Sequence, residues 1–143
     1  MSRINVNIRL MRKTPISVQV ELKIEATVNP SESSDKVISA ITNIFDGCSP
    51  EPKYGSLIIA RCFDLGCLTI IYDQVRSRAA LGVLRRMLLD NRISNTTWFL
   101  LNKQAAFAGV VVVTEHETES PLGPIRVKIV CDELDELIDW LAP

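Results

Sequence analysis

Residues 18–28 alternate between apolar and polar side chains, and this alternation constrains the fold more than any other feature. The apolar positions are Val18, Val20, Leu22, Ile24, Ala26 and Val28, and the polar positions between them are Gln19, Glu21, Lys23 and Glu25. A two-residue period is typical of a β-strand with one face buried and the other in water. Antiparallel sheets commonly have one such solvated face. The pattern therefore predicts a sheet with its other layer packed against a single face.

The N-terminal residues allow two interpretations. Residues 4–10 also alternate, and a polar break that ends at Pro15 separates them from the next strand. They form either a first strand that pairs with residues 17–28 as a hairpin, or an extension that lies outside the main fold. We therefore treat residues 1–15 as an N-terminal extension that could be a strand, and residues 16–143 as one α+β domain.

The rest of the chain divides into helical and strand patterns. A cluster of capping residues at 29–34 starts a helix that ends at Gly47. Residues 56–61 and 67–72 predict a hairpin, and the period of residues 73–91 predicts one helix. Further strands are expected at 96–101, 108–114 and 125–131, followed by a helix at 132–141.

The order of these elements predicts the fold class. The sequence β-β-α-β-β-α-β-β-β-α mixes hairpins with helices, so most strands pair with neighbours along the chain. This order favours an α+β fold in which a two-layer, antiparallel-rich sheet carries helices on one face.

Charge is distributed unevenly along a chain whose net charge is only −1. The segment 74–92 carries five arginines and one aspartate, whereas residues 115–143 carry eight acidic side chains and two basic ones. A nearly neutral protein can still present a local basic face. Two interpretations stay open. The arginines contact RNA phosphates, or they pair with the acidic half of the same molecule or of a second copy.

The sequence offers little support for an enzyme, a metal site or a membrane span. His116 is the single histidine and lies among carboxylates, and neither GxxxxGK[ST] nor GxGxxG occurs. The four cysteines lack CxxC spacing, so we expect small buried residues, with a disulfide as the alternative. The longest apolar run has nine residues, where a membrane span needs about 20. We expect a non-catalytic protein without cofactor, metal or small-molecule substrate.

Two further features concern the predicted strand at residues 96–101 and the segment that follows it. Trp98 and Phe99 are adjacent in a strand and therefore point to opposite faces, so that one packs in the core and the other is free to stack on a partner. The small residues of segment 102–109 allow close approach of the backbone to another surface, which would direct Lys103 and Gln104 outward.

Three blocks carry a resemblance to a known family. Residues 99–109 (FLLNKQAAFAG), 119–125 (ESPLGPI) and 137–143 (LIDWLAP) resemble the uncharacterised archaeal protein family 0201, and the similarity covers residues 18–143. That family is grouped with predicted RNA-binding proteins, including a predicted exosome-associated relative. The resemblance implies an α+β fold similar to the fifth protein of the large ribosomal subunit, in archaeal cytoplasm. Residues 1–12 look like an addition to the family pattern, and residues 93–97 replace a longer helical segment.

The leading hypothesis is a non-catalytic RNA-binding module associated with ribosomal or RNA-processing machinery. The alternative is a homodimer without a nucleic-acid role, in which the basic helix of one subunit meets the acidic C-terminal region of another. The residues expected to contact RNA are Arg76, Arg78, Arg85, Arg86, Arg92, Lys103 and Gln104.

Overall fold

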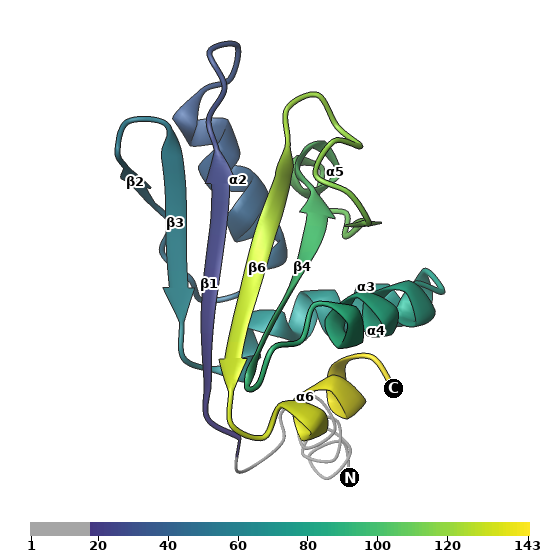
Figure 1. The fold of residues 1–143 in the computed structure, drawn as a ribbon. Helices are drawn as coiled ribbons and strands as arrows, with labels where there is room; N and C mark the ends of the chain where they lie inside the picture. The colour runs from purple at the N-terminus through teal and green to yellow at the C-terminus, as the bar shows by residue number, and fades with distance from the viewer. Residues whose placement is uncertain (1–17) are drawn as a thin grey trace, which may run out of the picture.

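The computed structural model describes residues 18–143, so the interpretations offered for residues 1–15 lie outside the described residues. Residues 18–143 form a sheet of six strands in the order β2-β3-β1-β6-β4-β5, and every neighbouring pair is antiparallel (Figure 1). The strands are β1 (Val20–Thr27), β2 (Glu51–Lys53), β3 (Leu57–Cys62), β4 (Thr96–Asn102), β5 (Val113–Thr114) and β6 (Pro124–Cys131).

Strand β1 has the two-sided character that its sequence predicts. It lies between β3 and β6, with Leu22 opposite Cys62 on one side and Ile129 on the other. Val20, Leu22, Ile24 and Ala26 are buried, whereas the residues between them are half-buried. The buried face of the sheet joins the helices in one continuous hydrophobic core.

The helices form a single layer on that face (Figure 1). No helix of residues 18–143 covers the opposite face, which we call the open face. The α+β fold with a six-stranded antiparallel sheet is therefore confirmed. The helices are α2 (Ser34–Ile44), the short 3₁₀ turn η1 (Leu65–Leu68), α3 (Thr69–Ser77), α4 (Leu81–Asp90), α5 (Lys103–Phe107) and α6 (Leu134–Leu141).

The predicted hairpin of residues 56–61 and 67–72 is wrong in its second half. Residues 57–62 form β3, but Asp64 accepts a bond from the Gly66 N–H and starts η1, which runs directly into α3. A short apolar run has the same composition in a buried helix as in a strand, so its period cannot distinguish them.

The single helix predicted for residues 73–91 is two helices. Ala79 adopts a left-handed φ of 56° and ends α3. The Ala80 N–H then bonds the Val75 carbonyl at 2.9 Å, and the Ala79 N–H bonds the Arg76 carbonyl at 3.4 Å. This pair of bonds is the Schellman arrangement, which usually has glycine at the left-handed position. An alanine there gives no sequence signal for a helix end.

Segment 102–112 also differs from its prediction. The Asn102 side chain caps the short helix α5 by accepting a bond from the Ala105 N–H at 2.8 Å. Gln74 then binds the next stretch, donating to the Gly109 carbonyl and accepting from the Val111 N–H. Because a side chain satisfies this backbone, the strand predicted at 108–114 is reduced to the two residues of β5.

The cysteines are buried or half-buried, as their apolar character predicts. Cys62 at the end of β3 and Cys67 in η1 form a disulfide, which was the alternative expectation. Cys48 and Cys131 are free thiols. Burial raises the pKa of both thiols.

Candidate nucleic-acid interface

Arg76 is occupied inside the protein. Its guanidinium donates to the carbonyls of Tyr72, Leu141 and Trp140 at 2.7–3.2 Å and lies 3.3 Å from the centre of the Tyr72 ring. The carbonyls of residues 140 and 141 lie at the end of α6 and lack partners within that helix. Arg76 therefore joins α3 to the end of α6, and its donors are directed away from any RNA.

Arg85, Arg86 and Arg92 pair with acidic residues of the same chain. Arg85 bonds Asp139 at 2.9 Å and the Ala142 carbonyl at 3.0 Å. Arg86 pairs with Glu115, and Arg92 pairs with Asp135. Of the two interpretations of the basic segment, pairing with the acidic half of the same molecule describes these three residues.

Arg78 is exposed and makes no ion pair within residues 18–143. It borders a groove of about 310 Å³ that is lined by apolar residues of α4 and segment 111–113. The structure thus leaves one of the five arginines unpaired, and they do not form a common basic face.

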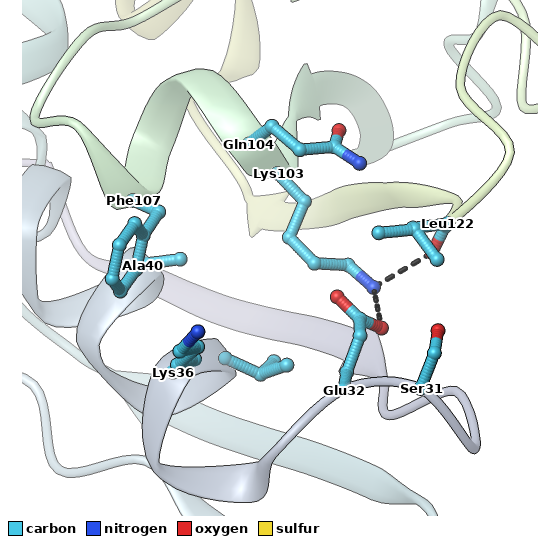
Figure 2. A pocket seen from close by; sticks show the side chains of 9 residues that line it. Ser31, Glu32, Lys36, Ala40, Lys103, Gln104, Phe107 and Leu122 are labelled. Atoms are coloured by element: carbon cyan, nitrogen blue, oxygen red, sulfur yellow. Dashed lines mark hydrogen bonds and ion pairs between the residues drawn. The ribbon is translucent and has the colours of Figure 1, made fainter.

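Lys103 is buried, so the expectation that it points outward is wrong. Its side chain is only 3% exposed. The ammonium donates to Glu32 Oε1 at 2.9 Å and to the Leu122 carbonyl at 2.7 Å (Figure 2), and to the Thr27 carbonyl at 2.8 Å. An ammonium has three N–H donors, and all three are used. Lys103 holds β1, the loop before α2 and the loop before β6 together.

Glu32 is the charged partner of Lys103. Burial removes water from its carboxyl and raises its pKa, but the bonds from Lys103 and from Asn29 outweigh that effect and leave the pKa below its ordinary value. The carboxylate is therefore ionised near neutral pH. Gln104, in contrast, is exposed as expected, and its Oε1 accepts a bond from the Ser120 hydroxyl at 2.9 Å.

The open face carries a row of cations that was not predicted from the sequence. Arg61 of β3 lies opposite Lys23 of β1, Lys23 lies opposite Lys128 of β6, and Lys128 lies opposite Trp98 of β4. Residues directly opposite in antiparallel strands share a face and lie about 5 Å apart. We call Arg61, Lys23, Lys128 and Trp98 the cross-strand row.

Neighbouring side chains partly compensate the row. Arg61 pairs with Glu21 at 3.1 Å, and Lys23 lies 3.8 Å from Glu25. Lys128 is exposed and makes no ion pair with any residue between 18 and 143. Like charges directly opposite each other destabilise a sheet. Lys128 is therefore the cation of the row that is available to an anion.

Trp98 ends the row beside a further cation. The Arg126 guanidinium lies 4.7 Å from the centre of the Trp98 ring and also pairs with Glu117. Phe99 is fully buried, whereas Trp98 is half-buried, packs against the edge of the core and lines a small hollow beside α4, so only part of its ring is open to a partner. The face combines an aromatic ring with cations, which is the combination used by proteins that stack single-stranded bases.

The surroundings of His116 and the grouping of metal-ligating side chains can be described for residues 18–143. His116 is exposed, and the Glu119 carboxylate accepts bonds from the backbone N–H groups of Glu115 and His116. Within residues 18–143 no three His, Cys, Asp or Glu side chains converge as metal ligands. The same residues contain no helix long and apolar enough to cross a membrane.

Comparison with known proteins agrees with this fold. A family model described as RNA binding matches residues 21–131. A UPF0201 protein from Sulfurisphaera tokodaii is 39% identical over 123 residues, which cover 84% of this chain and 85% of the relative. One from Pyrobaculum islandicum is 35% identical over 85% of this chain and 90% of the relative.

The solved structures that resemble this chain include UPF0201 proteins as well. A UPF0201 protein from Methanococcus jannaschii is 31% identical with a TM-score of 0.73, over 86% of this chain and 92% of that one. An uncharacterised UPF0201 protein is 26% identical with a TM-score of 0.74, over 86% and 93% of the two chains. The chain therefore belongs to the UPF0201 family, whose family model carries the description RNA binding.

Proposed function

We propose that this protein is a non-catalytic RNA-binding module that contacts single-stranded RNA through the open face of its sheet. The observation that carries the proposal is the cross-strand row, in which three cations lie in register and end at Trp98. Phosphates bind at Lys23, Lys128 and Arg61, and a base stacks at Trp98. The family description supports the choice of RNA as the partner.

The open face is a better candidate than the arginine-rich helices because of the local charge. Arg85 and Arg92 lie against α6 and the residues before it, which hold Asp132, Glu133, Asp135, Glu136 and Asp139. Acidic side chains therefore outnumber basic ones there and repel a phosphate backbone. Glu21, Glu25 and Glu117 lie beside the row, but exposed ion pairs are weak, so phosphates can compete with these three carboxylates.

Binding to a single-stranded RNA pool by filter retention across a salt series tests the proposal. For single strands the logarithm of affinity falls with the logarithm of salt by about 0.7 per phosphate contacted. Lys23→Gln/Lys128→Gln should weaken binding and lower this slope by about 1.4. Trp98→Leu should weaken binding by ~1–3 kcal/mol with little change in slope.

Arg78→Gln/Arg92→Gln is the matched control, because it removes the same charge from the helical side and neither residue lines the hollow that Trp98 shares with Arg86. It should leave both the affinity and the salt slope close to those of the unmodified protein. Unchanged binding in the Lys23/Lys128 variant, together with loss in the control, would transfer the RNA surface to the helices and refute the proposal.

The cellular context belongs to the same proposal. We infer a cytoplasmic protein that works beside ribosomal or RNA-processing machinery, with a fold related to the fifth protein of the large ribosomal subunit. Co-sedimentation with ribosomal subunits in a gradient, lost in the Lys23/Lys128 variant, is the expected result. If the protein is found only in the fractions of unbound protein and not with the ribosomal subunits, the proposed association with ribosomes is refuted.

The alternative is a homodimer without an RNA role, and ion pairs within one chain weaken the charge argument for it. It required the basic segment of one subunit to pair with the acidic region of another, and Arg85, Arg86 and Arg92 already make such pairs within one chain. Light scattering over a concentration series, with Arg85→Glu/Arg86→Glu as the test variant, decides whether a dimer forms through these residues.

A further inference from the structure

A pocket of about 240 Å³ lies between α2 and α5, at the end of the sheet where β1 and β4 finish. It is smaller than the pockets that enclose drug-sized ligands, which measure about 300–1,000 Å³. Figure 2 shows Phe107 and Lys36 on one side of it and Glu32 and Lys103 on the other. The space is suited to one flat ring with an aromatic wall and a polar edge.

The aromatic wall is exposed to solvent. Phe107 is 49% exposed although it is a large apolar side chain, and the Lys36 ammonium lies 5.9 Å from the centre of its ring. Lys36 makes no ion pair within the described residues 18–143. The half-exposed ring and the ammonium over it provide an aromatic contact for a base and a position for a phosphate.

The polar edge has one free acceptor. Glu32 Oε1 accepts from the Asn29 N–H at 3.0 Å, from Asn29 Nδ2 at 2.9 Å and from Lys103 Nζ at 2.9 Å. The other carboxylate oxygen receives no bond from residues 18–143 and is turned toward the pocket (Figure 2). An ionised carboxylate held in this way accepts hydrogen bonds from N–H groups of a ligand.

Gln104 supplies the complementary donor. Its Oε1 accepts from the Ser120 hydroxyl, so its NH₂ group is available to a ligand at the rim of the pocket that Gln104 lines. The pocket therefore offers a charged acceptor, an amide donor and a stacking surface. Guanine fits this set, because its ring N–H and exocyclic amino group are donors beside a carbonyl acceptor. Uracil has one N–H donor, cytosine has only its amino group, and adenine has no carbonyl.

We propose that this pocket binds one unpaired guanine nucleotide, with the base stacked on Phe107, its N–H groups on Glu32, its carbonyl on Gln104 and its phosphate near Lys36. The proposal rests on the proposed function, because it assigns the base preference of the RNA that the open face holds. Thr27, whose carbonyl binds Lys103 beside the pocket, lies four residues along β1 from Lys23, or roughly 13 Å. The row and the pocket lie on opposite sides of the sheet, so a single strand that contacts both has to pass over the end of the sheet where β1 finishes.

Titration of the full chain with GMP, AMP, CMP and UMP, followed by two-dimensional NMR, tests the pocket separately from RNA. GMP should shift the signals of pocket residues and bind at least fivefold more tightly than each of the other nucleotides. Phe107→Leu should weaken GMP binding about tenfold, which corresponds to ~1.4 kcal/mol. Gln104→Ala should reduce the preference for GMP over AMP.

The Lys23→Gln/Lys128→Gln variant separates the two proposals. It should bind GMP like the unmodified protein while it loses binding to the RNA pool. Normal GMP binding with no effect of this variant on RNA would refute the open face and leave the pocket standing. Equal affinity for GMP and UMP, or GMP binding unaffected by Phe107→Leu, would overturn the guanine pocket even if the open face binds RNA.

Discussion

Replacement of Lys103 by Met gives the most informative test of the buried ion pair. Methionine keeps the length and the apolar stem of the side chain but removes the ammonium and its three bonds to Thr27, Glu32 and Leu122. Glu32 is only 12% exposed and would remain charged. Removal of one partner from a buried pair costs about 3–5 kcal/mol, because the other charge stays uncompensated.

The loss of unfolding free energy caused by Lys103→Met should depend on pH, and the environment of Glu32 predicts the direction of that dependence. In the folded protein the pKa of Glu32 is below its ordinary value of 4.5, so its contribution to stability is present above that value and is lost as pH falls through the lowered pKa. Without Lys103, burial raises the pKa of Glu32 with less to oppose it. The charged carboxylate then destabilises the variant near pH 7, and protonation relieves it as pH falls.

Urea unfolding at pH 7 and at pH 4 measures the loss of unfolding free energy and its dependence on pH. We expect Lys103→Met to lose about 3–5 kcal/mol of unfolding free energy at pH 7, and the difference from the unmodified protein to narrow toward pH 4. Lys36→Met is the control, because it removes the same charge from an exposed site and should change stability by less than about 0.5 kcal/mol. A loss below about 1 kcal/mol, or one independent of pH, would refute the reasoning.

Two further predictions concern the helices. Ala79→Gly should raise the unfolding free energy by about 0.5–1 kcal/mol in the same assay, because Ala79 is strained at φ 56° and the Ala80 N–H already completes the helix end. A decrease of the unfolding free energy by the same amount would show that the extra conformational freedom of glycine in the unfolded chain outweighs the relief of strain. Arg76→Met should lower the unfolding free energy by ~2–3 kcal/mol, because it removes the donor of three hydrogen bonds to carbonyls. Arg92→Met should lower it by less than ~1 kcal/mol, because it removes a single exposed ion pair. Similar losses for both variants would contradict the role of Arg76 in joining α3 to the end of α6.

The periodic elements of this fold could be predicted from sequence because their patterns are local. The alternation of residues 18–28, the capping cluster before α2 and the apolar stripe of α6 each fix an element without information from the rest of the chain. The errors at residues 67–72, 73–91 and 108–114 have a different origin. Residues 67–72 form a short apolar run that is compatible with strand or helix, and only its packing beside the Cys62–Cys67 disulfide decides between them.

The candidate site was harder to predict because charge alone does not show where a cation is used. Arg76 is basic in sequence, yet it serves the carbonyls at the end of α6, which lies 64 residues away along the chain. Lys103 stands in a segment of small residues, yet its partners come from two other loops. A signal did exist for the open face, since Lys23, Lys128 and Trp98 all occupy the less buried positions of alternating strands.

The register of the strands brings the cations of the open face together into one surface. Arg61, Lys23 and Lys128 lie on three strands that are separated by up to 105 residues of sequence, and only the pairing of β1 with β3 and β6 aligns them. A shift of one residue in either pairing would turn the affected cation toward the helices, where a charge without a partner is costly. The hydrophobic alternation that fixes the register for the core therefore also assembles the cross-strand row. In this fold the buried face determines the arrangement of charges on the open one, so the surface proposed for RNA depends on the same packing that stabilises the sheet.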